Sequence, residues 1–283
     1  MRVKEFVMGN LLLGIARDVG PRIMKITTRD RPEVNLFAVL PDTGVNTPEG
    51  FWHIYGGHRL WSSPESMPRS YSMDDTPVRV QMKNGRVNIY GNPEIQNNIQ
   101  KSIEIYPAGE STIEVVHQIK NIGRWPVKLA CWALSVMKPG GFAIIPVKAG
   151  GEGLLPDRHL TLWPYTDISD RRLVMEKDII FLKQDVKCKG PIKIGATASP
   201  RWTAYWVDGL LFIKKFIQGK GEYPDFGCNV EAYTNSEMLE LETIGVLKNL
   251  NPGSTVEHKE IWTVKKIPVL SPVQEDVDKK VQF

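Results

Sequence analysis

The 283-residue sequence has little of what marks several large classes of protein. Its three cysteines, Cys131, Cys188 and Cys228, lie far apart without CxxC spacing, so they predict neither a disulfide framework nor a thiolate metal site. No apolar run approaches the ~18 residues of a membrane span. The run LLLGIA, residues 11–16, is shorter than the ~7–15 residues of a signal-peptide core. These absences favour a soluble cytoplasmic protein.

Nucleotide-binding and hydrolase motifs are missing too. The chain contains no GxGxxG, P-loop, HExxH or GxSxG pattern, which argues against dinucleotide binding, phosphate-loop chemistry, HExxH zinc proteolysis and α/β-hydrolase acyl transfer. The net charge of +4 is small, and basic and acidic residues are interspersed, so we expect no nucleic-acid or membrane partner. No ligand spacing predicts a metal ion, and we expect no cofactor.

What the sequence does contain is a succession of short extended segments separated by turn residues. Asn84-Gly85 stands between VRVQMK and RVNIYG, which predicts a hairpin because both central positions of a type I′ turn need positive φ. Twenty prolines and twenty-four glycines leave little room for long helices. We therefore predict a mostly β protein, a single large antiparallel β-sandwich over residues 1–270 with a polar tail over 271–283. The Gly- and Pro-rich stretch 138–157 is expected to be a loop within that domain.

The segment NSEMLELETIG, residues 235–245, separates its side chains between two faces by period-2 alternation. Leu239 and Leu241 suit the core. The opposite face carries Glu240 and Glu242 between apolar neighbours, and a carboxyl group in such surroundings can have a raised pKa and act as a general base. Two solvated glutamates on an exposed face are the equally weighted alternative.

Two further segments carry candidate site residues. In EHKEIWTV, residues 257–264, His258 shares a face with Glu260, and it would lie beside the two glutamates if this strand paired with theirs through the Asn251-Pro252-Gly253 turn. In YGGHRLWSSPE, residues 55–65, a glycine pair precedes several polar and aromatic residues: His58, Arg59, Trp61 and Glu65. Tryptophans beside polar loops are typical of sugar-binding pockets, although eight tryptophans can equally fill the core and rim of a β protein.

Three stretches together resemble the galactose-mutarotase-like superfamily of β-supersandwich proteins. They are NLLLGIARDVGPRIMKI, YGGHRLWSSPE, and the long segment from Tyr223 to Val264 that includes LELET. The resemblance covers most of the chain and implies a sugar ligand. It is more specific for the fold than for the activity, since such folds also serve as lyase domains and accessory domains.

The resemblance implies roles for particular residues. In aldose 1-epimerases of this superfamily a glutamate in a Leu-Glu-Thr sequence is the general base, which here is Glu242. An arginine binds sugar hydroxyls, and Arg59 is the nearest match. The family's mid-chain histidine, which protonates the ring oxygen, has no counterpart in PVKLACWALSVM, where Trp132 or a neighbour takes its place.

The resulting hypothesis is an aldose 1-epimerase-like enzyme with Glu242 as base and His58 as acid. The expected sugar contacts are Arg59, Trp61, Glu65, Glu240 and His258. A carbohydrate-binding or sensing domain without catalysis is the alternative, favoured by the missing histidine. A glycoside hydrolase or polysaccharide lyase is a third, which would need carboxyl groups ~5–9.5 Å apart on either side of the bond.

Overall fold

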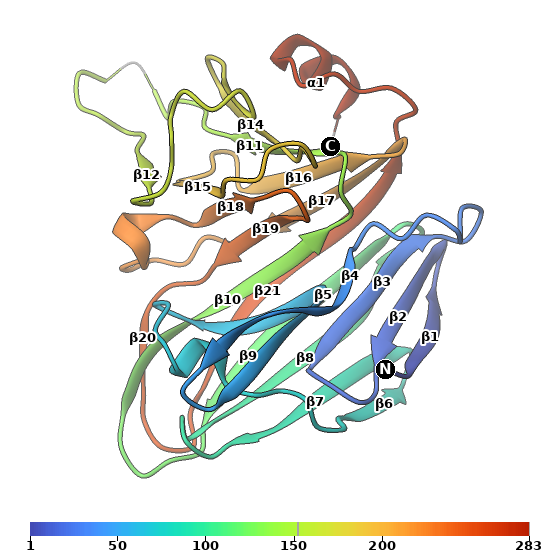
Figure 1. The fold of residues 1–283 in the computed structure, drawn as a ribbon, viewed down its shortest axis with the longest axis vertical. Helices are drawn as coiled ribbons and strands as arrows, with labels where there is room; N and C mark the ends of the chain where they lie inside the picture. The colour runs from blue at the N-terminus through green and yellow to red at the C-terminus, as the bar shows by residue number, and fades with distance from the viewer. Residues whose placement is uncertain (152, 283) are drawn as a thin grey trace.

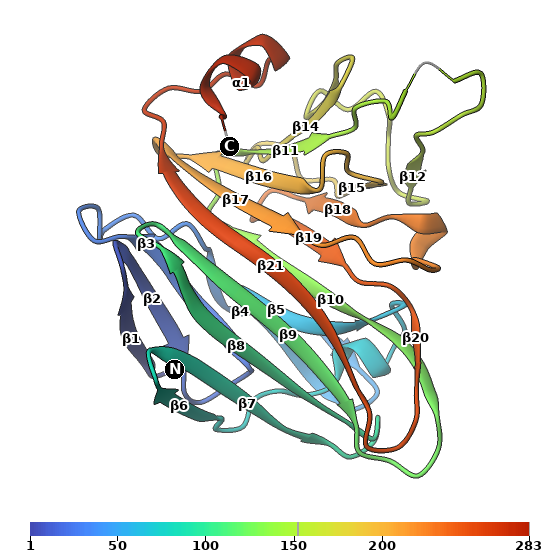
Figure 2. The same cartoon turned by 180° about the vertical axis from the view of Figure 1, so that it is seen from behind.

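The computed structural model describes residues 1–151 and 153–282. Two large antiparallel sheets account for most of it and pack face to face. Figure 1 shows the first sheet in front, with strand β10 (Val127–Met137) crossing the middle of the molecule; Figure 2, from behind, shows the second sheet with β21 (Thr255–Lys266) across it. The expectation of a mostly β, antiparallel sandwich is confirmed.

Within the described residues the first sheet has eleven strands. In spatial order its main path is β1 (Val3–Met8), β2 (Leu11–Ala16), β3 (Arg22–Thr28), β5 (Gly50–Ser63), β10, β19 (Leu239–Ile244), β18 (Val230–Thr234), β15 (Ile192–Ala196) and β12 (Leu160–Leu162). Off this path, β20 (Lys248–Leu250) pairs with β10 and β4 (Val39–Thr47) pairs with β5.

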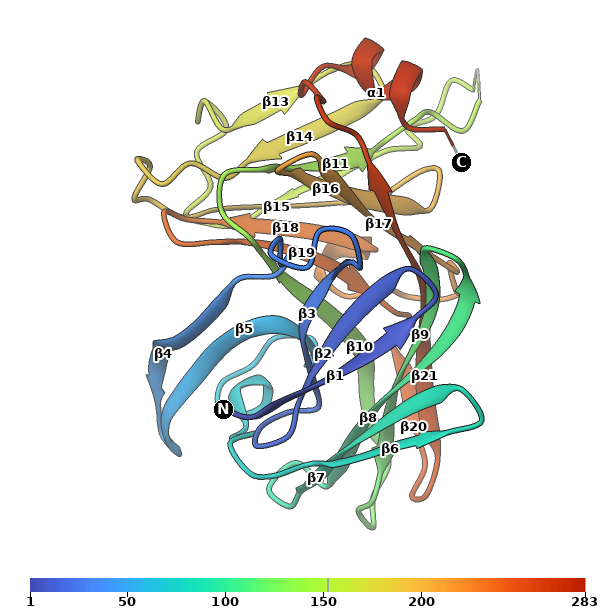
Figure 3. The same cartoon turned by 90° about the vertical axis from the view of Figure 1, so that its right-hand side faces the viewer.

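The second sheet has ten strands in the same part of the chain. Their order is β13 (Leu173–Met175), β14 (Ile179–Lys183), β11 (Phe142–Pro146), β16 (Trp202–Val207), β17 (Leu210–Phe216), β21, β9 (Thr112–Asn121), β8 (Ile99–Gly109), β7 (Arg86–Glu94) and β6 (Arg79–Lys83). The helical segments are η1 (Arg69–Tyr71), η2 (Asp225–Gly227) and α1 (Gln274–Lys280). Figure 3 shows β13, β14 and α1 at one end of the molecule and β6 and β7 at the other. No helix in the described residues has the length and apolar character needed to cross a membrane.

The main core lies between the two sheets, and alternation along each strand decides which side chains enter it. In β19, Leu239 and Leu241 are fully buried among core residues of both sheets. Burying one such side chain stabilises the fold by about 1.5–3 kcal/mol. Glu240 and Glu242 therefore point away from the other sheet, to the outer face of the eleven-stranded sheet. There a separate apolar cluster, which includes Trp61, Trp132 and Met238, covers the strands.

The hairpin expected at Asn84-Gly85 forms between β6 and β7. Lys83 pairs with Arg86, and both turn residues have positive φ, 52° and 74°. One other expectation is wrong, and one pairing that the sequence left open is not formed. The stretch 138–157 is not a continuous loop, because the apolar residues Phe142–Pro146 form the buried strand β11 between β14 and β16. The LELET strand β19 does not pair with β21, because the chain crosses to the other sheet after the Asn251-Pro252-Gly253 turn.

The C-terminal segment, expected to be a polar tail, contains the short helix α1. Its Val277 is buried in the same small apolar cluster as Ile267 and Leu270, and Val281, which follows the helix, is buried there too. Asp276 and Lys280 form an i,i+4 ion pair on the helix surface. The segment is thus attached to the ten-stranded sheet through a few apolar side chains.

Candidate functional site

The glycine pair of YGGHRLWSSPE lies where strand β5 changes partners. Residues up to Gly56 pair with β4, and residues from Gly57 onward pair with β10. Both glycines have positive φ, 81° and 69°, and a Cβ atom at Gly56 would lie 2.2 Å from the carbonyl oxygen of Ala38. The strand can bend at this place only because no side chain is present. The part of β5 that carries His58, Arg59 and Trp61 begins directly after this bend.

From this bend onward, successive β5 side chains point to opposite sides of the sheet. Cross-strand register sets Arg59 opposite Leu134 of β10, which in turn lies opposite Glu242 of β19. Residues directly opposite one another point to the same face, so Arg59 and Glu242 share the outer face. His58 pairs with Ser135 and points into the sandwich.

A cavity of about 210 Å³ opens on this outer face. We call it the sheet pocket. Five adjacent strands of the first sheet contribute to it: β5, β10, β19, β18 and β15. Its lining combines aromatic rings with charged groups: Trp52, Arg59, Trp61, Glu65, Tyr71, Trp132, Tyr165, Lys193, Tyr233 and Glu240.

Arg59 and Glu240 form a buried ion pair in one wall of the pocket. The Arg59 Nη2 atom lies 2.8 Å from Glu240 Oε1, and the two side chains are only 3% and 11% exposed. The guanidinium group also lies over the ring of Trp61, 4.4 Å from its centroid. Arg59 Nε and Nη1 are buried and have no hydrogen-bond acceptor in the described residues, so three N–H groups of the guanidinium are unpaired. Glu65 accepts a short hydrogen bond from the Tyr71 hydroxyl at the rim.

Glu242 is fully buried beneath the pocket, where it contacts two of the lining residues, Trp132 and Lys193. Its Oε2 atom accepts hydrogen bonds from Trp132 Nε1 at 2.8 Å and from Lys193 Nζ at 3.1 Å. Lys193 is also 2.7 Å from Glu231 of the neighbouring strand β18. Burial raises the pKa of Glu242, and Lys193 offsets part of that rise. Burial alone would lower the pKa of Lys193, but Glu231 and Glu242 outweigh it and hold that pKa well above its usual range.

His58 is a member of a different group, which lies between the two sheets. Its Nε2 atom is 2.7 Å from His117 Nε2, and its Nδ1 atom is 2.9 Å from Ser135 Oγ. His117 Nδ1 faces the carbonyl oxygen of His258 at 3.0 Å and therefore carries the proton. The expected catalytic pairing of His58 with Glu242 is not formed, because successive strand residues face opposite sides.

His258 is also found in this interior group, away from the sheet pocket. Its Nε2 atom lies 2.8 Å from Thr243 Oγ1. Glu260 accepts a hydrogen bond from Trp262 Nε1 at 2.7 Å and pairs with Lys214 at 2.9 Å. The expected contact between His258 and a sugar does not occur in this arrangement. His258 lies on β21 in the other sheet, and its side chain points between the two sheets.

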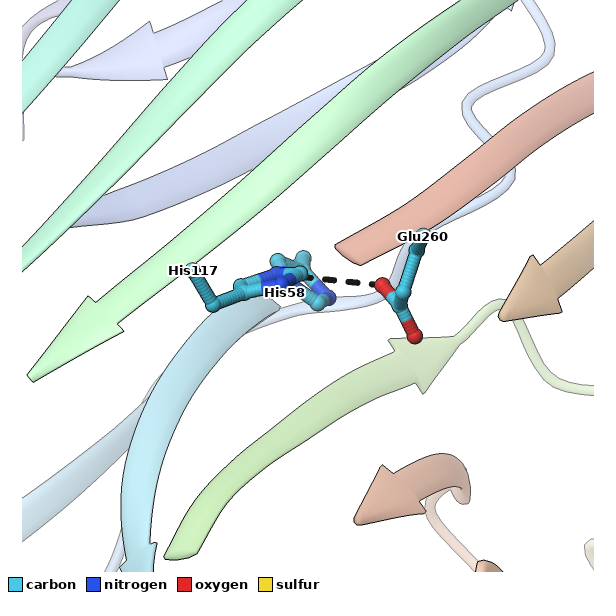
Figure 4. Close-up of side chains that lie close together, drawn as sticks. All are labelled: His58, His117 and Glu260. Carbon is cyan, nitrogen blue, oxygen red and sulfur yellow. Dashed lines mark hydrogen bonds and ion pairs between the residues drawn. The ribbon is translucent and has the colours of Figure 1, made fainter. Parts of the chain in front are cut away.

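Three residues of the interior group are close enough to ligate a metal ion. The ligand atoms of His58, His117 and Glu260 lie within 4.8 Å of one another, and Figure 4 shows the two rings side by side with the carboxylate opposite. Lys214 already neutralises Glu260 at 2.9 Å, and His58 Nε2 is hydrogen-bonded to His117 Nε2. Burial lowers the pKa of both histidines, so both are neutral at pH 7. In this group the charge of Glu260 is therefore neutralised by Lys214, and the ring nitrogens of both histidines have hydrogen-bond partners.

The structure thus brings together five of the seven site residues expected from the sequence: Arg59, Trp61, Glu65, Glu240 and Glu242. Sequence reasoning missed Lys193 and Glu231. Each is a single charged residue within an apolar strand, IKIGA and VEAYT, and both are buried. An isolated charge at a buried strand position is the signal that would have found them.

Comparisons with known proteins agree with this architecture. No family model matches the sequence, and no curated protein matches it significantly. Among solved structures, a galactose mutarotase-like protein from Lactobacillus casei superposes with a TM-score of 0.62 over 93% of this chain and 100% of its own, at 9% identity. A candidate mutarotase from Salmonella typhimurium gives 0.56 over 93% and 94%, also at 9% identity.

This chain has the galactose-mutarotase-like fold. A candidate aldose 1-epimerase from Klebsiella pneumoniae agrees, with a TM-score of 0.54 over 91% of this chain and 77% of its own at 11% identity. Identities this low concern the fold alone. Within the galactose-mutarotase-like fold of this chain, the sheet pocket is the place where LELET and GGHRLW meet on one face.

Proposed function

We propose that this protein binds a small sugar in the sheet pocket. The observation that carries the proposal is the buried Arg59–Glu240 ion pair, surrounded by the rings of Trp61, Tyr71 and Trp132. Aromatic rings stack on the apolar faces of sugars, and fixed charged groups bind their hydroxyls. Arg59 lines the pocket, and its Nε and Nη1 atoms have no hydrogen-bond acceptor in the described residues, which favours a role in binding a ligand's hydroxyl groups.

The size of the cavity fits a single sugar ring. Its volume of about 210 Å³ lies below the ~300–1,000 Å³ of pockets for drug-sized ligands. The basic groups are already paired with carboxylates, Arg59 with Glu240 and Lys193 with Glu231 and Glu242. We therefore expect hydroxyl recognition to dominate over charge recognition.

Mutarotase-like catalysis at the anomeric centre is the second candidate. The position of Glu242 beneath the lining residues Trp132 and Lys193 supports it, as do its raised pKa and its Oε1 atom, which has no donor in the described residues. A carboxyl group of raised pKa suits proton transfer near neutral pH. Catalysis requires Trp132 and Lys193 to uncover Glu242, since its side chain is fully buried.

Hydrolysis of a glycosidic bond has less support. Glu240 and Glu242 leave the same strand on the same face, and Glu242 is enclosed, so the two do not flank a bond. A cytoplasmic location stays a prediction from the sequence.

Calorimetry with a panel of monosaccharides tests sugar binding. We expect at least one sugar to bind the wild-type protein, and Arg59→Lys to weaken that binding by tenfold or more. Lysine retains the charge but loses the planar donors and the stacking on Trp61. The matched control is Arg79→Lys, whose guanidinium stacks 4.3 Å from the Tyr90 ring on the other sheet; it should bind like the wild type. No binding by any sugar would refute the proposal.

Anomer exchange followed by NMR tests the second candidate. If the wild-type protein accelerates exchange of the bound sugar, Glu242→Gln should abolish the acceleration while binding persists. His58→Asn should retain the acceleration if it folds, because His58 lies on the other face of the sheet. Binding without acceleration by the wild-type protein would support the non-catalytic alternative.

A further inference from the structure

Two carboxyl groups face each other beneath the sheet pocket. Glu231 of β18 and Glu242 of β19 lie directly opposite in the register of the two strands. Both are fully buried, and both carboxyl groups contact the same atom, Lys193 Nζ. Like charges directly opposite on adjacent strands repel, and in a buried site water does not screen them.

A single cation serves this pair. Lys193 Nζ lies 2.7 Å from Glu231 and 3.1 Å from Glu242. It is held between the rings of Trp132 and Trp163, 4.6 Å from each centroid, so its position is restricted. If both carboxyl groups were ionised, one negative charge would remain uncompensated. Uncompensated buried charge costs several kcal/mol, and taking up a proton is the usual way in which a protein avoids that cost.

Apart from Lys193, which favours the ionised form of both carboxyl groups, the charged groups around the pair favour the protonated form. With Lys193 included, the four groups come from β15, from β19 itself, from η2 and from the segment after β5: Lys193, Glu240, Asp225 and Glu65. Three of the four are acidic. Arg59, the nearest other cation on this face, is paired with Glu240. The surroundings therefore do not supply the missing positive charge.

Hydrogen bonding points to the same conclusion. Glu231 Oε1 and Glu242 Oε1 have no hydrogen-bond donor in the described residues. Buried carboxyl oxygens are almost always hydrogen-bonded, and a proton between the two groups would provide the donor that both lack. Burial also raises the pKa of both residues, and that of Glu231 most strongly.

We propose that Glu231 and Glu242 share one proton at neutral pH, and that Glu231 thereby sets the protonation state of the Glu242 carboxyl group beneath the pocket. Glu231 is then a positioning residue for Glu242. The pair titrates as a unit, so the proton belongs to both residues.

A catalytic role for this pair rests on the proposed function. In that role the shared proton would replace the family's mid-chain histidine, which this chain lacks. When a sugar ring opens, the bond between the anomeric carbon and the ring oxygen breaks, the anomeric hydroxyl loses a proton and the ring oxygen gains one. Once Trp132 and Lys193 move away from Glu242, the pair can accept the first proton on the Glu242 oxygen that they release and donate its own proton to the ring oxygen. It holds one proton before and after the step, so atoms and charge balance.

Infrared spectroscopy of the ligand-free protein tests the sharing. At pH 7 we expect one protonated-carboxyl C=O band, far above the pH where glutamic acid normally ionises, near ~4.3. The band should vanish in Glu231→Gln and also in Glu242→Gln, because either single carboxylate is neutralised by Lys193. The control Glu240→Gln, on the same face of β19, should retain it.

Each other outcome overturns the proposal. Absence of the band in the wild-type protein is enough to overturn it, even if a variant fails to fold. Persistence of the band in Glu231→Gln, or in one of the two variants only, assigns the proton to a single residue. The spectra need no sugar, so their failure is distinct from failure of the calorimetric test of sugar binding.

Discussion

At the scale of single residues, the sheet pocket depends on buried charges, with two cations set against three carboxyl groups. Arg59 is matched with Glu240, and Lys193 with Glu231 and Glu242. A buried ion pair adds little net stability, yet removing one partner leaves an uncompensated charge. Substitution of one of these residues should therefore destabilise the fold, even where the residue touches no ligand.

Replacing Lys193 tests this dependence. Lys193→Met should lower the free energy of unfolding at pH 7 by about 3–5 kcal/mol, because it leaves two buried carboxyl groups without their cation. Lys128→Met is the matched control, since Lys128 and Glu222 form an ion pair that is more than half exposed. It should cost at most about 1 kcal/mol. Equal effects of the two variants in urea unfolding would contradict the account.

At the scale of elements, strand β5 connects the parts of the site. It begins beside β4, bends at Gly56 and Gly57, and continues beside β10. The bend allows one strand to place Trp52 before it and Arg59 and Trp61 after it in the same wall. The glycine pair is thus a requirement of the pocket's shape.

Substitution of Gly57 tests the role of the bend. A Cβ atom there would lie 2.5 Å from the carbonyl oxygen of Ile23, and the residue has φ of 69°. Gly57→Ala should therefore destabilise the protein by about 2–4 kcal/mol, more than strain at positive φ alone, which is ~1–2 kcal/mol. Gly85→Ala is the control, with φ of 74° and no atom near the added methyl group. If both variants unfold at the same urea concentration, crowding at the bend is unimportant.

Alternation within strands could be predicted from the sequence, but strand partners could not. LELET correctly divides into Leu239 and Leu241 inside and Glu240 and Glu242 outside, because period 2 is a local property. The sheet to which β21 belongs depends on non-local pairing, so His258 was assigned to the wrong side. His58 and Arg59 are adjacent in one strand and cannot both face the pocket, a local rule that the sequence already contained.

At the scale of the whole molecule, two of the buried polar regions in the described residues have different roles. One lies between the sheets and joins them, since Lys214 of β17 donates to the carbonyl oxygens of Ala133 and Leu241 across the interface. The other lies under the sheet pocket. The sequence predicts the sandwich, but Lys193 and Glu231 meet across strands distant in the chain, so no local pattern identifies them as partners.

Acid should destabilise the whole molecule through the interior histidines. Burial lowers the pKa of His58 and His117, and lowers that of His258 to about 3. The unfolded chain binds protons at these residues below about pH 6.5 while the folded chain does not, so stability is lost as pH falls from 6.5 toward 3. At pH 5 the loss is up to about 2 kcal/mol per histidine. Guanidinium midpoints at pH 7 and pH 5 measure it, and equal midpoints would be inconsistent with neutral buried histidines.

The proton on the Glu231–Glu242 pair acts in the opposite sense. Its folded-state pKa is raised, so this group stabilises the protein fully below the ordinary pKa of glutamate and loses that contribution as pH rises through the folded value. Between pH 7 and pH 5 it therefore offsets the loss of stability that about one of the three histidines causes. In Glu231→Gln the offset disappears, and the loss of stability from pH 7 to pH 5 should be larger than in the wild type. A smaller loss would contradict the shared proton.

The central claim, that the sheet pocket binds a sugar, is tested most directly by the indole N–H resonances of the tryptophans in ¹⁵N NMR. During titration with a binding sugar, we predict saturable shifts of the Trp61 and Trp132 resonances, which line the pocket. Trp262, buried in the core between the sheets, and Trp125, 80% exposed on a loop, should not move. A panel of sugars that shifts neither pocket resonance, or shifts only Trp125, would contradict the account.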